Sequence, residues 1–337
     1  MYTNVSVLLD PNDKENTIDL LRDPRELSVG THDKLFHADE VMACALLAQY
    51  YHLPVVIVRT RDPKILTWCD AVVDVGNVFD PEMMRFDHHQ ETYTGTRSSA
   101  GMVLDWLESK AYIDSDIADQ LRYAYMDEID AIDNGVYPGK PGTSFSNGIG
   151  ALNHHDKDMQ NLDPQHIRFE QAVKQVMFLL ECLEPGYEQK MKDWEIVRPL
   201  VAKVQRTDEI LELPEFLHWQ APVGSDDGQH INRVIWPETN GKGEEEWRVA
   251  VPNRPGSIPG KAANPYDLRP GTELPAYDRA KKFIPDLVFV HKNYFIGATS
   301  SRDTAYELAN LIVDDEFPSQ MDWRRNTNKT LTRKRRK

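Results

Sequence analysis

The stretch that decides the fold reads Asp70-Ala-Val-Val-Asp-Val-Gly-Asn-Val-Phe-Asp-Pro-Glu-Met-Met-Arg-Phe-Asp-His-His-Gln90. Its apolar start, residues 71–75, predicts a buried strand of a parallel sheet that Asp74 interrupts. Because a buried carboxylate without a partner is costly, we expect Asp74 at the carboxyl end of this strand, where α/β sheets place their ligand sites. The later Asp87-His-His89 adds two imidazoles beside a carboxylate. Together these residues predict a site for a divalent metal ion.

Strands and helices alternate around this stretch. Strands are expected at residues 26–31 and 53–59, and helices at 38–51, 63–68, 98–107 and 114–132. Alternation of this kind predicts an α/β fold with a doubly wound, mostly parallel sheet and right-handed crossovers.

The candidate metal ligands are imidazoles and carboxylates that stand where strands or helices end. They are His32, His37, Asp39, Asp74, His88, His89 and either Asp130 or Asp133. The carboxyl end of a helix disfavours a carboxylate unless a cation lies beside it, which is the situation expected for the last two. Mixed imidazole and carboxylate ligands suit Mn²⁺, and two ions that share one Asp form a hydrolytic site. We therefore predict two Mn²⁺ ions, with Mg²⁺ as the alternative.

Ser98 and Ser99 stand where one of the helices begins. Either serine is a natural N-cap. The free N–H groups of a helix start also suit a phosphate oxygen. The sequence leaves capping and substrate binding both open for these serines.

Four segments are expected along the chain. They are an irregular lead-in over residues 1–25, a metal-binding catalytic domain over 26–206, a smaller α+β domain over 207–315 that binds substrate, and a basic disordered tail over 316–337. Two amphipathic packing helices are expected at 167–183 and 187–204 in the catalytic domain. The α+β domain should hold strands within 210–219, 234–236 and 247–252, a hairpin from 287–291 and 294–297, and a helix over 302–313.

Charge is divided unevenly between the tail and the rest of the chain. The formal net charge is −15, yet residues 324–337 carry eight of the 39 basic side chains and no acidic one. Such a tail could hold nucleic acid by counterion release or, in a eukaryote, act as a nuclear import signal. A solvated end without a partner is the alternative.

Composition excludes several classes of protein. A hydrophobic content of 40% supports packed cores, while the three scattered cysteines argue against a disulfide framework or a zinc ribbon. The sequence has no apolar run of membrane-spanning length and a polar start, so we expect a soluble intracellular protein with no membrane partner. It would be cytoplasmic in a prokaryote or virus, and nuclear or mitochondrial in a eukaryote.

Six ordered motifs carry a resemblance to a known family. They are Thr31-His-Asp-Lys-Leu-Phe-His-Ala-Asp-Glu40, Val58-Arg-Thr-Arg-Asp-Pro63, Val72-Val-Asp-Val-Gly76, Phe86-Asp-His-His-Gln90, Ser98-Ser-Ala-Gly101 and Asp130-Ala-Ile-Asp-Asn-Gly135. In this order they resemble the melanocyte proliferating gene product family of the DHH phosphoesterase superfamily. The resemblance resumes at residues 288–297, and it spans most of residues 30–312.

The resemblance implies a metal-dependent exonuclease that degrades single-stranded RNA from its 3' end. It implies that Asp74 bridges two ions, that His32, His37, Asp39, His88 and Asp133 are further ligands, and that His89 contacts the phosphate. Asp133 is preferred over Asp130 because Asp133-Asn-Gly135 resembles the superfamily's Asp-Thr-Gly. The chain end of the substrate would be positioned by His291, Gly297 and Arg302.

Two features leave other functions open. Ala298 stands where the family usually has a second glycine, and residues 253–283 lack the family's usual Arg-Gly-Leu-Arg run. One alternative is a phosphoesterase for short oligonucleotides or small phosphoesters. The other is an RNA-binding or scaffolding protein without turnover. The sequence also leaves open whether copies of the chain associate.

Overall fold

The computed structural model describes residues 5–7, 14–136, 144–154, 162–252, 277–291 and 296–310. Contacts divide the chain into two compact units, Met1–Tyr187 and Glu188–Lys337. This division falls earlier than the boundary expected after residue 206. The expected basic tail, residues 316–337, and the start of the second hairpin strand lie outside the described residues.

The first unit is built on a six-stranded sheet. Its spatial order is β1 (Val5–Val7), β3 (Val55–Arg59), β2 (Leu27–Thr31), β4 (Ala71–Val73), β6 (Arg85–Phe86) and β5 (Phe79–Asp80). Among the described strands of this sheet, only β5 and β6 pair in antiparallel fashion. The expected mostly parallel sheet is therefore confirmed.

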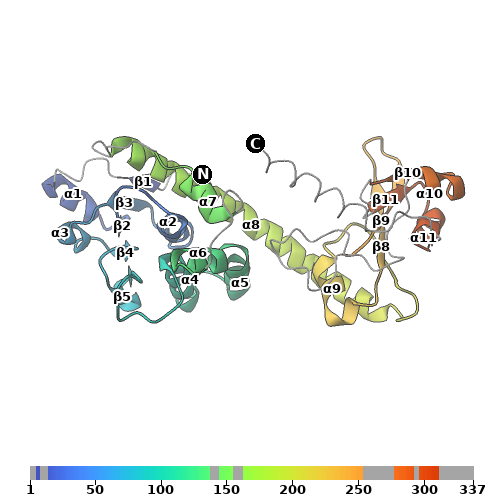
Figure 1. Ribbon diagram of the computed structural model, residues 1–337, viewed down its shortest axis with the longest axis horizontal. Coiled ribbons are helices and arrows are strands. Elements are labelled where there is room, and N and C mark those ends of the chain that lie inside the picture. Colours follow the sequence, from blue (N-terminus) through green and yellow to red (C-terminus); the bar gives the residue numbers. More distant parts are fainter. Residues whose placement is uncertain are drawn as a thin grey trace, which may run out of the picture. The chain divides into compact units, whose positions relative to one another are not determined.

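Helices cover both faces of this sheet (Figure 1). Val58 and Val72 pack in one cluster with α1 (Lys14–Leu21) and α3 (Pro63–Leu66). The neighbouring residues Ile57 and Val73 point the other way, into a larger core that includes α2 (Ala38–Tyr50) and α4 (Ser99–Ser109). Alternate residues of one strand thus serve two cores, as a doubly wound fold requires.

The expectation of an irregular lead-in over residues 1–25 is wrong where the structure describes them. β1 pairs in parallel with β3, and Leu21 of α1 is buried. A strand of three residues shows too little alternation for its sequence pattern to reveal it.

The remaining helices of the first unit differ from expectation in two places. The helix expected over 114–132 is α5 (Ser115–Leu121) and α6 (Asp127–Asp133), joined by a π-helical turn over Arg122–Met126. After α7 (Phe145–Gly150), the two helices expected at 167–183 and 187–204 form one, α8 (Asp163–Lys203), which continues through Pro185 and Gly186. Proline and glycine usually end a helix. Here the apolar side chains of α8 before and after them are buried in cores, and this packing stabilises the continuous helix.

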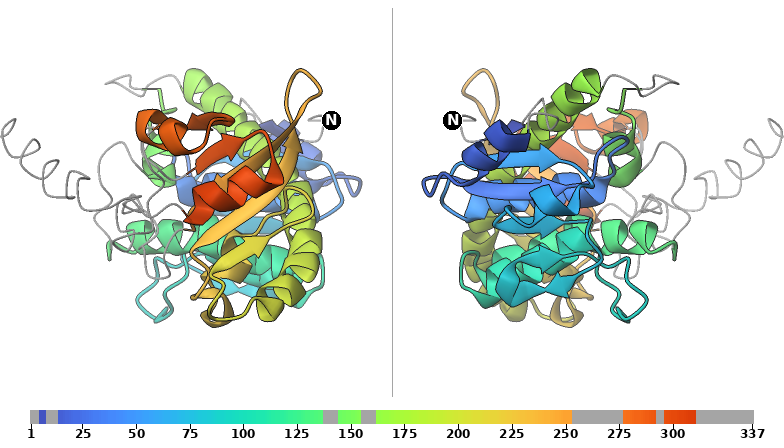
Figure 2. Two further views of the ribbon diagram at one scale, coloured as in Figure 1. Left: turned by 90° about the vertical axis from the view of Figure 1, so that its right-hand side faces the viewer. Right: turned by 90° about the vertical axis from the view of Figure 1, so that its left-hand side faces the viewer.

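The second unit contains a mixed five-stranded sheet. Its order is β10 (Leu287–Val290), β11 (Ile296–Thr299), β9 (Glu245–Ala250), β8 (Arg233–Thr239) and β7 (Ile210–Glu212). One face packs against α10 (Tyr277–Phe283) and α11 (Arg302–Asn310), which Figure 2 shows in red in its left view. The other face packs against α9 (Gln220–Gly224) and the last turns of α8. The observed strands and helices agree with the expected α+β domain, although β7 is shorter than the strand expected within 210–219.

No helix in the part of the chain that the structure describes has the length and apolar character needed to cross a membrane.

Candidate metal centre

Three neighbouring strands of the first sheet deliver the predicted ligands to one edge. β2, β4 and β6 lie side by side and run in parallel, so their carboxyl ends meet. His32 follows β2, Asp74 follows β4, and Asp87-His-His89 follows β6. Asp74 has a φ of +54°, in the left-handed region that non-glycine residues rarely adopt. Such backbone conformations concentrate at functional sites.

The structure brings the candidate ligands into two groups that share one residue. The first group is His32, His37, Glu40 and Asp74, and the second is Asp39, Asp74, His88 and Asp133. Within each group, the potential ligand atoms all lie within 4.8 Å of one another. Asp74 also forms a group with His88 and His89. One carboxylate therefore stands between two sets of donors, as the predicted bridging residue should.

The first group contains a residue that the sequence analysis did not select. Glu40 Oε1 lies 3.0 Å from His32 Nε2, and Asp74 Oδ2 lies 3.2 Å from the same nitrogen. The other ring nitrogen of His32, Nδ1, lies 2.8 Å from the carbonyl oxygen of Asp33. That contact directs Nε2 toward the carboxylates. Glu40 also accepts a hydrogen bond from the His37 amide at 2.9 Å, so its sequence position indicates a capping residue. The only signal for a ligand was its place beside Asp39 in the first motif.

The second group is centred on His88. Its Nε2 lies 2.8 Å from Asp133 Oδ2, 3.6 Å from Asp74 Oδ1 and 3.9 Å from Asp39 Oδ2. On the other side of the ring, Nδ1 is 3.4 Å from Asn134 Oδ1. The Nε2 nitrogen of His88 therefore faces three carboxylates.

Several buried polar atoms of the site lack hydrogen-bond partners, and they show whether a metal ion would fit there. Glu40 Oε2, Asp74 Oδ1 and His88 Nε2 are buried and, among the described residues, have no partner in hydrogen-bonding geometry. Buried polar atoms are rarely left in this state, and a bound metal ion would give them a partner. Imidazole nitrogens and carboxylate oxygens are ligands of Mn²⁺ and similar ions, so the residues present fit such a group.

The histidine pKa values show how strongly the carboxylates act. Burial on its own lowers the pKa of a histidine. For His32, the contacts with Asp74 and Glu40 outweigh burial and raise the pKa to about 10. For His88, the contacts with Asp133 and Asp74 do the same and raise it to about 11. Without a metal ion, both rings therefore carry a proton on each nitrogen at neutral pH. A metal ion that binds Nε2 must displace the proton on that nitrogen.

The carboxylates respond to the same crowding in opposite directions. Burial raises the pKa of Asp39 well above its usual range, and the nearby charges of Asp74 and Asp133 add to this effect. Although Asp74 is also buried, its contacts with His32 and His88 lower its pKa. A divalent cation would relieve the repulsion that Asp39 experiences.

Asp39 occupies the helix start that was expected to bind phosphate. Its carboxylate accepts hydrogen bonds from the amides of Ser99 at 3.0 Å and Ala100 at 2.6 Å. Ser98 and Ser99 are fully buried. A carboxylate from α2 therefore already uses the N–H groups of this helix start. Binding of a substrate phosphate by Ser98 or Ser99 stays a prediction.

Asp130, the alternative to Asp133 in the sixth motif, has a different task. It accepts hydrogen bonds from both the amide and the hydroxyl of Ser98 at 2.8 Å, so this hydroxyl does not cap its own helix. Arg97 donates to the same carboxylate at 2.9 Å. A Cβ atom at Gly101 would lie 2.5 Å from Asp130 Oδ1, which explains the glycine in the fifth motif. Asp133, not Asp130, lies among the potential ligands.

His89 is held differently from His88. Its side chain is 57% exposed, and its Nδ1 lies 2.7 Å from the buried carboxylate of Asp87. Asp87 also accepts from the amide of Asn77 at 2.6 Å, which fixes the carboxylate. The sequence analysis did not assign this role to Asp87. The contact orients His89 and leaves its Nε2 without a hydrogen bond among the described residues.

The three substrate-binding candidates of the α+β domain belong to the second unit. The amide of His291 donates to the carbonyl of Ile296 at 2.8 Å. A Cβ atom at Gly297 would lie 3.1 Å from the carbonyl oxygen of Phe289, so this glycine permits close strand packing. Arg302 donates to both oxygens of Glu212, at 2.8 and 2.6 Å. Their roles toward a substrate stay predictions.

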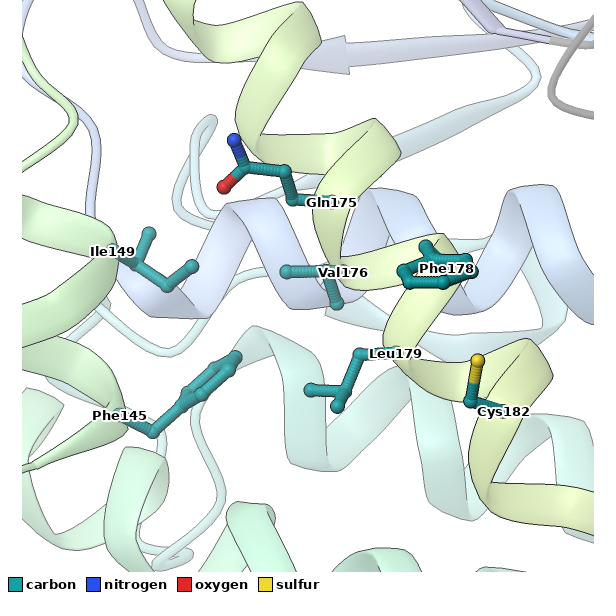
Figure 3. A pocket seen from close by; sticks show the side chains of 7 residues that line it. All are labelled: Phe145, Ile149, Gln175, Val176, Phe178, Leu179 and Cys182. Carbon is teal, nitrogen blue, oxygen red and sulfur yellow. The ribbon is translucent and has the colours of Figure 1, made fainter.

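A pocket elsewhere on the first unit has a different chemical character (Figure 3). Its lining side chains are apolar apart from Gln175, and they include Phe145, Val176 and Cys182. It contains none of the candidate metal ligands.

Comparison with known proteins identifies the family. Residues 28–313 match the model of the MYG1 exonuclease family, which is described as uncharacterised protein family UPF0160. The chain belongs to this family. It is 33% identical over 306 residues to the MYG1 protein of Chlamydia trachomatis, an alignment that covers 86% of this chain and 97% of that protein. The expected family membership is thereby confirmed, while the placement in the DHH phosphoesterase superfamily stays a prediction.

Mammalian members of the MYG1 family show similar likeness. The chain is 30% identical to the MYG1 exonuclease of Mus musculus over 351 residues, which cover 89% of this chain and 87% of that protein. It is also 30% identical to the MYG1 exonuclease of Homo sapiens over 353 residues, which cover 89% and 88%.

Proposed function

We propose that this member of the MYG1 family is a two-metal phosphodiesterase of the DHH phosphoesterase type that removes nucleotides from the 3' end of single-stranded RNA. The names of the mammalian relatives support an exonuclease. The observation that carries the proposal is that Asp74 belongs to both groups of potential ligands. Two ions that share a carboxylate are a recurrent arrangement for phosphodiester cleavage.

Each residue has a distinct part in this proposal. One ion would be held by His32, His37, Glu40 and Asp74, and the other by Asp39, Asp74, His88 and Asp133. Bound there, Mn²⁺ or Mg²⁺ would supply positive charge to the phosphate oxygens and lower the pKa of water in the site. His89, which Asp87 orients through Nδ1, would donate from Nε2 to a phosphate oxygen.

The second unit would hold the end of the RNA chain through His291, Gly297 and Arg302. Arg302 is already paired with Glu212, so it would contact a phosphate only by sharing or exchanging that partner. Short oligonucleotides are a second candidate substrate, because the 54 acidic side chains against 39 basic ones weaken attraction to a long polyanion.

The test is cleavage of end-labelled single-stranded RNA by the full chain, with Mn²⁺ and with EDTA. We expect stepwise shortening from the 3' end that requires the metal, and Asp74→Asn should reduce its rate by at least roughly 10³-fold. Asn is the suitable replacement because it tolerates the left-handed backbone at this position. Glu181→Gln, an exposed change on α8, should keep the wild-type rate.

The other outcomes select among the alternatives. Hydrolysis of only dinucleotides or small phosphoesters would replace the RNA substrate with the smaller class. If the chain binds RNA and metal but cleaves none of these substrates, the protein is a binding protein and the proposal is wrong.

A further inference from the structure

The loop between β2 and α2 carries two potential ligands but has no regular structure of its own. His32 and His37 stand at its two ends, and the first ligand group needs both of them. Lys34, within the loop, has a φ of +68°. Something outside the loop must therefore fix its path.

A side chain far along the sequence contacts this loop at the residue before His37. The Phe36 amide donates to Asn153 Oδ1 at 2.9 Å, and Asn153 Nδ2 donates to the Phe36 carbonyl at 2.7 Å. One side chain thus satisfies both backbone polar groups of Phe36, as a paired strand would. Asn153 is 6% exposed and Phe36 is fully buried, so both hydrogen bonds form away from water.

Asn153 is itself held in place. Its Nδ2 also donates to the carbonyl of Gly150 at 2.9 Å, and Gln165 donates to its Oδ1. Gln165 in turn accepts from the His154 amide at 2.7 Å. A fixed amide can impose its position on the loop, because the network leaves it few alternative arrangements.

We propose that Asn153 is a positioning residue of the metal centre, which sets where His37 lies by pairing with the backbone of Phe36. This inference rests on the proposed two-metal site. Asn153 touches neither ligand group, and it acts only on the group that contains His32 and His37. In the second group, Asp39 lies on α2, His88 follows β6 and Asp133 ends α6, so none of these three belongs to the loop; Asp74 is common to both groups.

The test is a calorimetric titration of the metal-free full chain with Mn²⁺. Wild type should show two binding events. Asn153→Ala should weaken one of them by roughly 10- to 100-fold, the usual effect of removing a partner that orients a ligand, and leave the other unchanged. His37→Ala should weaken the same event. The double variant should bind no more weakly than His37→Ala alone, since Asn153 acts through His37.

Matched variants separate positioning from general loss of stability. Ile149→Ala removes a buried side chain of α7 near Asn153, and it should lower the melting temperature while leaving both Mn²⁺ affinities unchanged. If Asn153→Ala does not fold, Gln165→Leu tests the same point, because it keeps Asn153 but removes the amide that holds it. Equal weakening of both events, or of neither, would overturn the inference. Wild-type protein that binds no Mn²⁺ would instead refute the proposed function.

Discussion

At the scale of single residues, His166 is a buried titratable group that does not belong to the candidate metal ligands. His166, at the start of α8, is 1% exposed, and neither ring nitrogen has a partner among the described residues. Burial, assisted by the nearby charge of Arg59, lowers the pKa of His166 to about 4. The folded protein therefore keeps this ring neutral.

This pKa predicts a loss of stability in weak acid. Below the usual pKa of 6.5, His166 is protonated in the unfolded chain, whereas in the folded chain it stays neutral down to about pH 4. The stability that comes from the neutral His166 ring is fully present above pH 6.5. As the pH falls toward 4, the free energy of unfolding decreases for this reason by up to about 3 kcal/mol. His166→Leu should remove this part of the pH dependence. Urea unfolding at pH 5 and at pH 7.5 would measure it.

The control for this prediction is the wild-type protein, unfolded in the same buffers at both pH values. If His166→Leu follows the wild-type curve, the neutral buried ring is not a source of acid sensitivity.

At the scale of elements, the start of α4 links two carboxylates to one helix. Asp39 accepts from the amides of Ser99 and Ala100, and Asp130 accepts from Ser98 and Arg97. Gly101 leaves the space that Asp130 fills. This helix start therefore holds two carboxylates, one of which, Asp39, is a potential metal ligand. The sequence had left both capping and substrate binding open for it.

Gly101→Ala should destabilise the protein although alanine is the better helix former. The added Cβ would approach Asp130 Oδ1 to 2.5 Å and Arg97 Cδ to 2.9 Å, so these side chains must move. We expect a loss of about 1–3 kcal/mol in the free energy of unfolding. In contrast, Gly148→Ala in α7 meets nothing within 4 Å and should stabilise by up to about 1 kcal/mol. Urea unfolding of both variants decides the matter, and similar shifts in the two would contradict the packing argument.

The sequence predicted elements well where patterns are long. The elements β2, α2, β3, α3, β4 and α4 lie where their apolar periodicity placed them, and most candidate ligands gather at one edge. The two-residue strands β5 and β6 were not expected. Prediction from the sequence failed where a side chain's role depends on partners that are distant along the chain. Ser98 and Ser99 carry a helix-start pattern, but their acceptors lie on other helices, and local sequence cannot reveal that these groups are already paired. Glu40 was missed because its pattern as a capping residue hides a second use.

At the scale of the whole molecule, charge is distributed unevenly along the chain. The formal net charge is −15, and without residues 324–337 the chain would keep 31 basic and 54 acidic side chains. An acidic protein repels RNA unless basic groups are concentrated somewhere.

Deletion of residues 324–337 should therefore weaken binding of single-stranded RNA by at least roughly tenfold at about 50 mM salt. The slope of log affinity against log salt should become shallower by about 2 or more, since fewer counterions are released. A chain that keeps this segment with its basic residues changed to Gln should behave like the deletion. Unchanged affinity and slope would mean that the segment is a solvated end without a role in RNA binding. Filter binding over a series of salt concentrations provides both numbers.

The short outer strands of the two sheets also affect how copies of the protein meet. As described, the first sheet ends on β1 and β5, of three and two residues, and the second on β7 and β10, of three and four. The pairing of β10 is also interrupted by a register shift. Unpaired backbone at a sheet edge is a template for aggregation, and short or irregular edge strands offer little of it. The fold thus resists edge-to-edge polymerisation, so concentrated samples should form no cross-β fibres while both units stay folded.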